Sequence, residues 1–95
     1  MNLNIRYDLP KETWEYVIPE IFLEVEGWLG YREEIPYWFS FREEEKYVSA
    51  SLEPNGLFFY GLMEDDEWER WKLQFKQAAT AKLKFQVGEI ELGEV

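Results

Sequence analysis

The stretch that decides the fold is residues 46–63, which read KYVSASLEPNGLFFYGLM. Side chains alternate in character on both sides of a Pro-Asn-Gly sequence, and a period of two predicts strands at 46–52 and 57–63. Asn and Gly tolerate the positive φ that hairpin turns demand, so this sequence predicts a tight antiparallel hairpin. A two-residue Asn55-Gly56 turn would place Leu52 opposite Phe59. Phe58 and Tyr60 would then lie on the face away from the core.

This hairpin leads into the clearest helix, predicted over 64–83. Trp68, Trp71 and Phe75 share one stripe at helical spacing, which is typical of a helix that covers a sheet. Acidic residues open the segment and Lys82 lies near its end, and both choices complement the helix dipole.

The remaining segments complete an α+β pattern. Strands are expected at 2–9, at 37–42 and at 85–92, the last with a bulge at Gly88. Residues 10–24 carry a helical stripe that Pro19 should kink or divide into two pieces. Residues 25–36 are expected to be the longest irregular loop. The predicted order is β-α-β-β-β-α-β, in a single domain over 1–95 with a mainly antiparallel sheet and two helices packed on one face.

The composition excludes several kinds of chemistry. The 95 residues include no His and no Cys, which removes imidazole and thiol mechanisms and a Cys-based zinc site. The 20 Asp+Glu outnumber the 10 Lys+Arg and give a net charge of -10. These acids occur in runs at predicted turns and at a helix start, where they are solvated and not tuned for catalysis. We therefore expect no catalytic, metal-binding or cofactor-binding residues, and a protein that is not an enzyme.

The basic residues are scattered along the chain, so we expect no nucleic-acid or anionic-membrane partner. No apolar stretch approaches the ~20 residues that span a bilayer. The N-terminal residues lack the apolar region of a signal peptide, and a cytoplasmic location is expected.

Aromatic residues are also abundant in this chain, with 5 Trp, 6 Tyr and 7 Phe. Among the rings outside the helical stripes, five lie in the expected loop or at strand positions with polar neighbours, and acidic residues occur near them. The candidate partner-binding residues are Trp28, Tyr31, Glu33, Glu34, Trp38, Glu43, Glu44, Phe58 and Tyr60. They form either a contact patch, since Tyr and Trp dominate interface hot spots, or a second small cluster under loop 25–36.

The leading interpretation is a small acidic non-enzymatic binding protein, of an inhibitor or immunity type, that occludes a basic protein partner such as a toxin or nuclease. In size and acidity the chain is similar to small bacterial immunity proteins, a likeness of composition alone. One alternative is an aromatic-lined pocket between the sheet and loop 25–36 for a small cationic or apolar ligand. Another is a structural or regulatory subunit that forms a homodimer through Phe58 and Tyr60.

Overall fold

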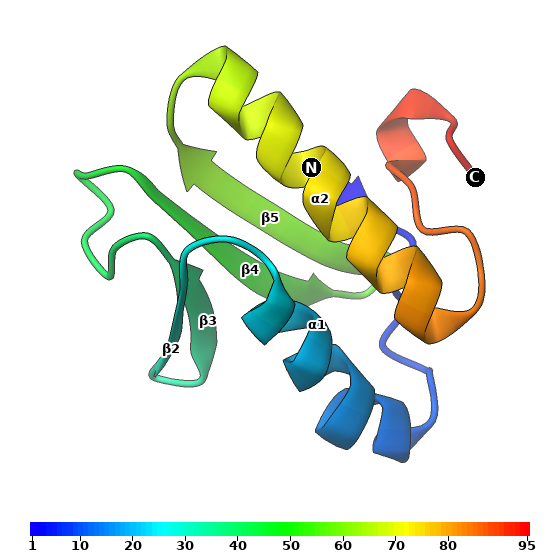
Figure 1. The fold of residues 1–95 in the computed structure, drawn as a ribbon. Coiled ribbons are helices and arrows are strands. Elements are labelled where there is room, and N and C mark those ends of the chain that lie inside the picture. The colour runs from blue at the N-terminus through cyan, green and yellow to red at the C-terminus, as the bar shows by residue number, and fades with distance from the viewer.

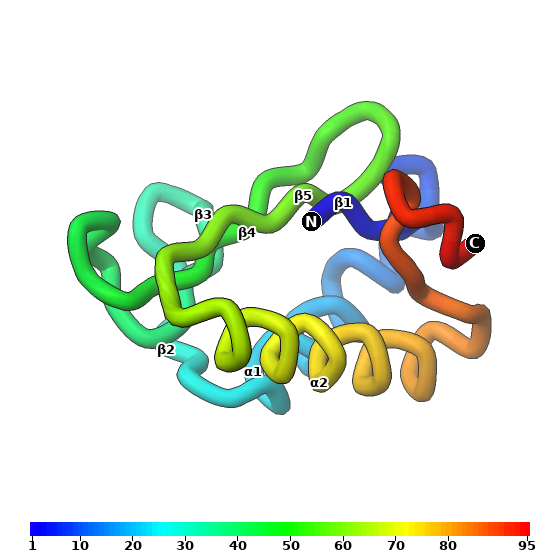
Figure 2. Tube along the Cα trace, turned by 90° about the horizontal axis from the view of Figure 1, so that it is seen from above, coloured from blue at the N-terminus to red at the C-terminus, as the bar shows by residue number.

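The computed structural model describes residues 1–95 and shows an antiparallel five-stranded sheet with helices on one of its faces (Figure 1). The strands lie in the order β1-β5-β4-β3-β2. Their bounds are Asn2–Leu3 for β1, Trp28–Arg32 for β2, Ile35–Trp38 for β3, Tyr47–Glu53 for β4 and Gly56–Leu62 for β5. Figure 2 shows α1 and α2 together on the same side of the sheet. The predicted α+β class, with an antiparallel sheet and two helices, is confirmed.

The helical segments agree with the sequence pattern. A π-helical turn, η1 (Thr13–Val17), passes directly into α1 (Ile18–Glu24), and both residues at the junction have helical backbone angles. Pro19 stands in the first turn of α1, so the segment is not divided at Pro19 as the sequence suggested. The long helix α2 covers Asp65–Leu83. None of the helices is both long enough and apolar enough to cross a bilayer.

The central hairpin has the predicted faces but a different turn. Glu53 pairs with Gly56, so the turn is Pro54-Asn55, and Leu52 lies opposite Leu57, not opposite Phe59. A shift of two residues leaves every side chain on its face, because side chains alternate with a period of two. Gly56 is needed for strand packing and not for the turn, because a Cβ at this position would collide with the carbonyl oxygen of Leu3 in β1.

Residues 25–36 do not form the expected irregular loop. Arg32 pairs with Ile35, and β2 and β3 form a hairpin around Glu33 and Glu34, whose φ angles are 52° and 70°. Two positive φ values identify a type I′ turn, which usually contains Asn and Gly. The strand predicted at 37–42 starts earlier and ends at Trp38.

The two terminal strands were predicted too long. Only Asn2 and Leu3 pair within the sheet, and Tyr7 is 59% exposed. Residues 85–92 form no strand and no bulge at Gly88. They make one bridge, between Leu3 and Glu89, and then the 3-10 turn η2 (Ile90–Leu92). The observed order is therefore β-α-β-β-β-β-α.

One core of 15 buried residues joins the sheet to both helices. Trp38 lies at its centre and is fully buried, and its indole N–H donates to the carbonyl oxygen of Phe22 in α1 at 3.1 Å. Its ring meets those of Phe22 and Trp71 edge to face, each at 5.2 Å between ring centroids. The helices therefore cover one sheet face and leave the other uncovered (Figure 2).

Candidate functional site

The residues predicted to form one contact patch lie in separate parts of the fold. Trp38 is fully buried and cannot touch a partner, so the prediction is wrong for this residue. Trp28 and Tyr31 lie on the helix side of the sheet, with ring centroids 5.7 Å and 6.4 Å from that of Phe22. These two rings pack the β2–β3 hairpin against α1, and Trp28 joins the main core. They do not form the separate cluster, under a loop that covers Phe58 and Tyr60, that the second interpretation expected.

The acidic candidates also separate. Glu33 and Glu34 are exposed at the tip of the β2–β3 hairpin. Glu44 is exposed and pairs with Arg42 at 2.8 Å. Glu43 alone approaches the aromatic residues, because its Oε2 accepts a hydrogen bond of 2.8 Å from the hydroxyl of Tyr37.

Phe58 and Tyr60 do lie on the uncovered face, with ring centroids 4.9 Å apart. Their cross-strand neighbours in β4 are Ser51 and Ser49. Strand alternation places Tyr47 on this face too, and the pairing of Tyr37 with Ser49 places Tyr37 there. We call this surface the outer face; it consists of Tyr37, Tyr47, Ser49, Ser51, Phe58 and Tyr60.

The outer face contains a hollow of about 300 Å³. Serines occupy the middle of β4, and their small side chains leave space between larger rings. Tyr37 and Tyr47 stand with ring centroids 6.3 Å apart, and the half-exposed Tyr60 lines the hollow with them. Glu43 lines it as well, so tyrosine rings and a carboxylate border the same space.

The hydroxyl of Tyr37 connects charges of both signs. It donates to Glu43 and accepts a hydrogen bond of 3.2 Å from Nη2 of Arg32. The guanidinium carbon of Arg32 lies 5.0 Å from the centroid of the Tyr37 ring, within the range of a cation–π contact. Nη1 of Arg32 donates to the carbonyl oxygen of Phe41 at 2.7 Å, which fixes the guanidinium.

The phenols of Tyr37 and Tyr47 remain neutral around neutral pH. Burial, followed by the hydrogen bond to Glu43 and its charge, raises the pKa of Tyr37. Burial, followed by the charge of Glu43, raises the pKa of Tyr47. The hollow therefore offers ring faces, neutral hydroxyls and a carboxylate, a combination that recognises organic cations. No group of three or more Asp or Glu side chains converges to hold a metal ion.

The sequence prediction missed two of the residues that matter here. Tyr47 follows from the same alternation that placed Phe58 and Tyr60, because Tyr47, Ser49 and Ser51 are two residues apart. Tyr37 required the β3–β4 register, and the unrecognised β2–β3 hairpin concealed it.

A scan against protein-family models found no match to this chain, and searches of curated proteins and of solved structures found none.

Proposed function

We propose that this protein is a non-enzymatic binding protein whose outer face receives a basic protein partner. The hollow on the outer face carries the proposal, because three tyrosine rings and the carboxylate of Glu43 line one space on an uncovered sheet. Tyr37 is buried and Tyr60 is half-exposed, so the rings form part of the wall of the hollow and Tyr60 is open to a partner. Tyr is enriched at interface hot spots.

Charge complementarity selects the partner. A net charge of -10 attracts a basic protein over a distance set by the Debye length, ~10 Å at 0.1 M salt. At contact, a Lys or Arg side chain of the partner would enter the hollow beside Glu43. The contact between Arg32 and Tyr37 is an example, within the chain itself, of a guanidinium held over one of these rings.

Such binding inhibits by occlusion. A toxin or nuclease that uses basic residues to bind nucleic acid would present the same residues to this acidic, tyrosine-rich face. The bound protein would then cover the surface that its partner needs for its substrate.

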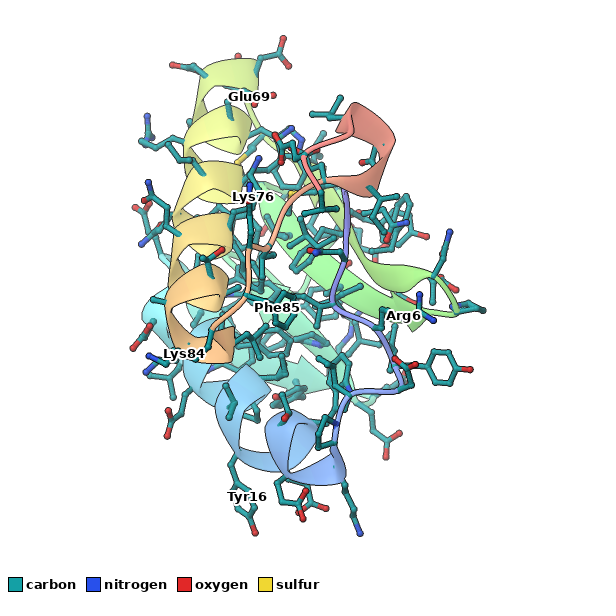
Figure 3. All side chains as sticks on the ribbon, turned by 90° about the vertical axis from the view of Figure 1, so that its right-hand side faces the viewer. Arg6, Tyr16, Glu69, Lys76, Lys84 and Phe85 are labelled. Carbon is teal, nitrogen blue, oxygen red and sulfur yellow. The ribbon has the colours of Figure 1, made fainter.

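The test compares matched double variants. A basic protein captured from a lysate of the source cells is identified and purified, and its affinity is measured for Tyr47→Ser with Tyr60→Ser. We expect a loss of at least ~30-fold, since hot-spot residues cost ~2 kcal/mol or more. The control is Tyr7→Ser with Tyr16→Ser, whose rings are 59% and 66% exposed. Figure 3 shows Tyr16 pointing away from the body of the protein.

The control variant should bind within about threefold of the original protein, because surface contacts outside a hot spot are nearly neutral. Equal losses in both variants would contradict the proposal, and so would an acidic captured partner. Self-association that disappears only in the Tyr47 and Tyr60 variant would assign the outer face to a second copy instead.

A further inference from the structure

We propose that the C-terminal segment, residues 84–95, exchanges between two copies of this chain, so that the segment of each copy docks on α2 and β1 of the other. Figure 1 shows this segment returning beside α2 from the end of that helix. No residue of β1 or α2 lines the hollow of the outer face, so the proposal does not depend on the partner proposed above.

Ion pairs hold the segment on α2. Glu89 lies beside Lys72 and Lys76, and Oε1 of Glu94 lies 3.2 Å from the ammonium of Lys76. The side chains of Lys72, Lys76 and Glu89 are at most 16% exposed, so salt screens these pairs little. In a chain of net charge -10, these two lysines form a local basic site that is complementary to an acidic segment.

Hydrogen bonds fix the register of the docked segment. The backbone N–H of Asn4 donates to the carbonyl oxygen of Gly88 at 3.3 Å, and the N–H of Gly88 donates to Oδ1 of Asn4 at 3.0 Å. The N–H of Val87 donates to the hydroxyl of Thr80 in α2 at 2.9 Å, and the side chain of Val87 is buried in the core. Each of these contacts joins the segment to a part of the chain before Lys84. A segment from a second copy can therefore make the same contacts in the same register.

The connection between α2 and the segment is strained. Helix α2 ends at Leu83, and Lys84 turns the chain back with a φ of 67° (Figure 3). A left-handed backbone is unfavourable for a residue with a Cβ, and glycine usually occupies this position after a helix. In an exchanged pair the segment continues outward to the other copy, and Lys84 leaves this conformation. Two such hinges are released in each pair, and strained hinges of this kind invite domain swapping.

Exchange should have a salt dependence of its own. Repulsion between two chains of net charge -10 acts over the Debye length, which falls from ~10 Å at 0.1 M salt to ~3 Å at 1 M. The buried ion pairs of Glu89 are screened much less. Higher salt should therefore favour the exchanged pair, which is the opposite of its effect on association with a basic partner.

The experiment mixes ¹⁴N- and ¹⁵N-labelled protein and treats the mixture with a carbodiimide, which couples an ammonium group to a carboxylate in contact with it. Mass spectrometry then shows whether the two halves of each linked peptide pair carry one isotope or both. We expect isotopically mixed Lys76–Glu94 links, whose fraction rises with protein concentration and with salt. The control is the Lys82–Glu24 link, which joins α2 to α1 across 3.2 Å and should stay unmixed.

A matched pair of variants tests the hinge. Lys84→Gly and Lys84→Ala remove the same charge, but only glycine relieves the backbone strain. Lys84→Gly should lower the association constant of the exchanged pair at least ~10-fold, and Lys84→Ala should leave it unchanged. The Tyr47 and Tyr60 variant should exchange normally, which separates this proposal from the proposed function. Lys76–Glu94 links that are never mixed, equal mixing in the Lys82–Glu24 control, or equal effects of the two Lys84 variants would overturn it.

Discussion

At the residue scale, Glu89 is the most constrained polar group in the chain. Its side chain is 5% exposed, and its two oxygens lie 3.7 Å from the ammonium of Lys72 and 2.9 Å from that of Lys76. Figure 3 shows Lys76 on the side of α2 that faces the C-terminal segment. Burial by itself would lower the pKa of Lys76, but hydrogen bonds to Glu89 and Glu94 outweigh it and raise that pKa. These ion pairs hold the C-terminal segment on α2.

Replacing Glu89 should therefore destabilise the fold. Glu89→Gln keeps the shape and leaves Lys72 and Lys76 poorly paired. Breaking a buried pair costs ~3–5 kcal/mol, and we expect about 2–3 kcal/mol here because both lysines keep another carboxylate partner. Glu44→Gln removes an exposed pair with Arg42 and should cost less than ~1 kcal/mol. Denaturant unfolding measures the free energy of unfolding of both variants. Equal losses would contradict the claim that the buried ion pairs of Glu89 stabilise the fold more than an exposed pair does.

Glu94 should make stability depend on pH on the acid side. The backbone N–H of Glu89, and then the ammonium of Lys76, lower the pKa of Glu94 from 4.5. A folded-state pKa below the unfolded value stabilises the fold above the unfolded pKa, and this contribution is lost as pH falls through the folded pKa.

The expected result is a difference between two unfolding curves. Glu94→Gln should be less stable than the original protein above pH 4.5, and the gap should close as pH falls below that value. Denaturant unfolding at a series of pH values measures the gap. A gap that stays constant through the acid range would show that Glu94 makes no such contribution.

At the element scale, the β2–β3 turn is built from residues that do not favour it. Both Glu33 and Glu34 have positive φ, which costs a non-glycine residue ~1–2 kcal/mol. The double substitution Glu33→Asn with Glu34→Gly supplies the residues that a type I′ turn prefers. We expect it to raise the free energy of unfolding by ~1–2 kcal/mol, measured by denaturant or thermal unfolding.

The matched control is Glu44→Asn with Glu45→Gly. It removes the same two charges at a site where neither residue has a positive φ. Added glycine without a need for positive φ increases the entropy of the unfolded chain, and this control also removes the exposed pairs of Glu44 and Glu45 with Arg42, so it should not stabilise the protein. Equal stabilisation in both variants would mean that charge relief, and not turn geometry, is the cause.

These turns also explain which parts of the fold could be predicted from the sequence. The stripe of Trp71 and Phe75 and the alternation around Phe59 reflect burial, and both were confirmed. Glu33-Glu34 carries no turn signal, so the sequence predicts a loop where the β2–β3 hairpin lies. The alternation of apolar residues on each side of Gly88 predicts a strand over 85–92. Alternation does not decide whether a segment pairs with a neighbouring strand, and here only Glu89 makes a bridge, to Leu3.

The candidate site was predictable only in part, for the same reason. Phe58 and Tyr60 follow from one hairpin, whereas Tyr37 becomes their neighbour only through the β3–β4 register. The sequence predicts Trp38 as a surface residue. In the structure, side chains alternate along β3, so Trp38 faces the helices and Tyr37 faces the other side of the sheet. A single strand does not reveal which of its faces the helices cover.

At the scale of the whole molecule, the helices cover one sheet face and leave the other uncovered (Figure 2). With a net charge of -10, association with a basic partner should slow strongly as salt rises from 0.1 M to 1 M, because the Debye length falls from ~10 Å to ~3 Å. Dissociation should change less. Stopped-flow measurement of both rates checks this expectation, and an on-rate independent of salt would remove the electrostatic part of the proposal.

The most direct test of the central claim is a titration of ¹⁵N-labelled protein with two peptides, Gly-Ser-Arg-Ser-Gly and its citrulline counterpart. Citrulline keeps the shape of Arg and removes the charge. The proposal requires the Arg peptide to shift the amide signals of Glu43, Tyr47, Ser49 and Tyr60 saturably. It should bind ~10-fold more tightly than the citrulline peptide, the ratio that a charge-assisted hydrogen bond gives. Equal shifts from both peptides, or shifts confined to acidic runs such as residues 64–67, would contradict the claim that the outer face receives a basic side chain.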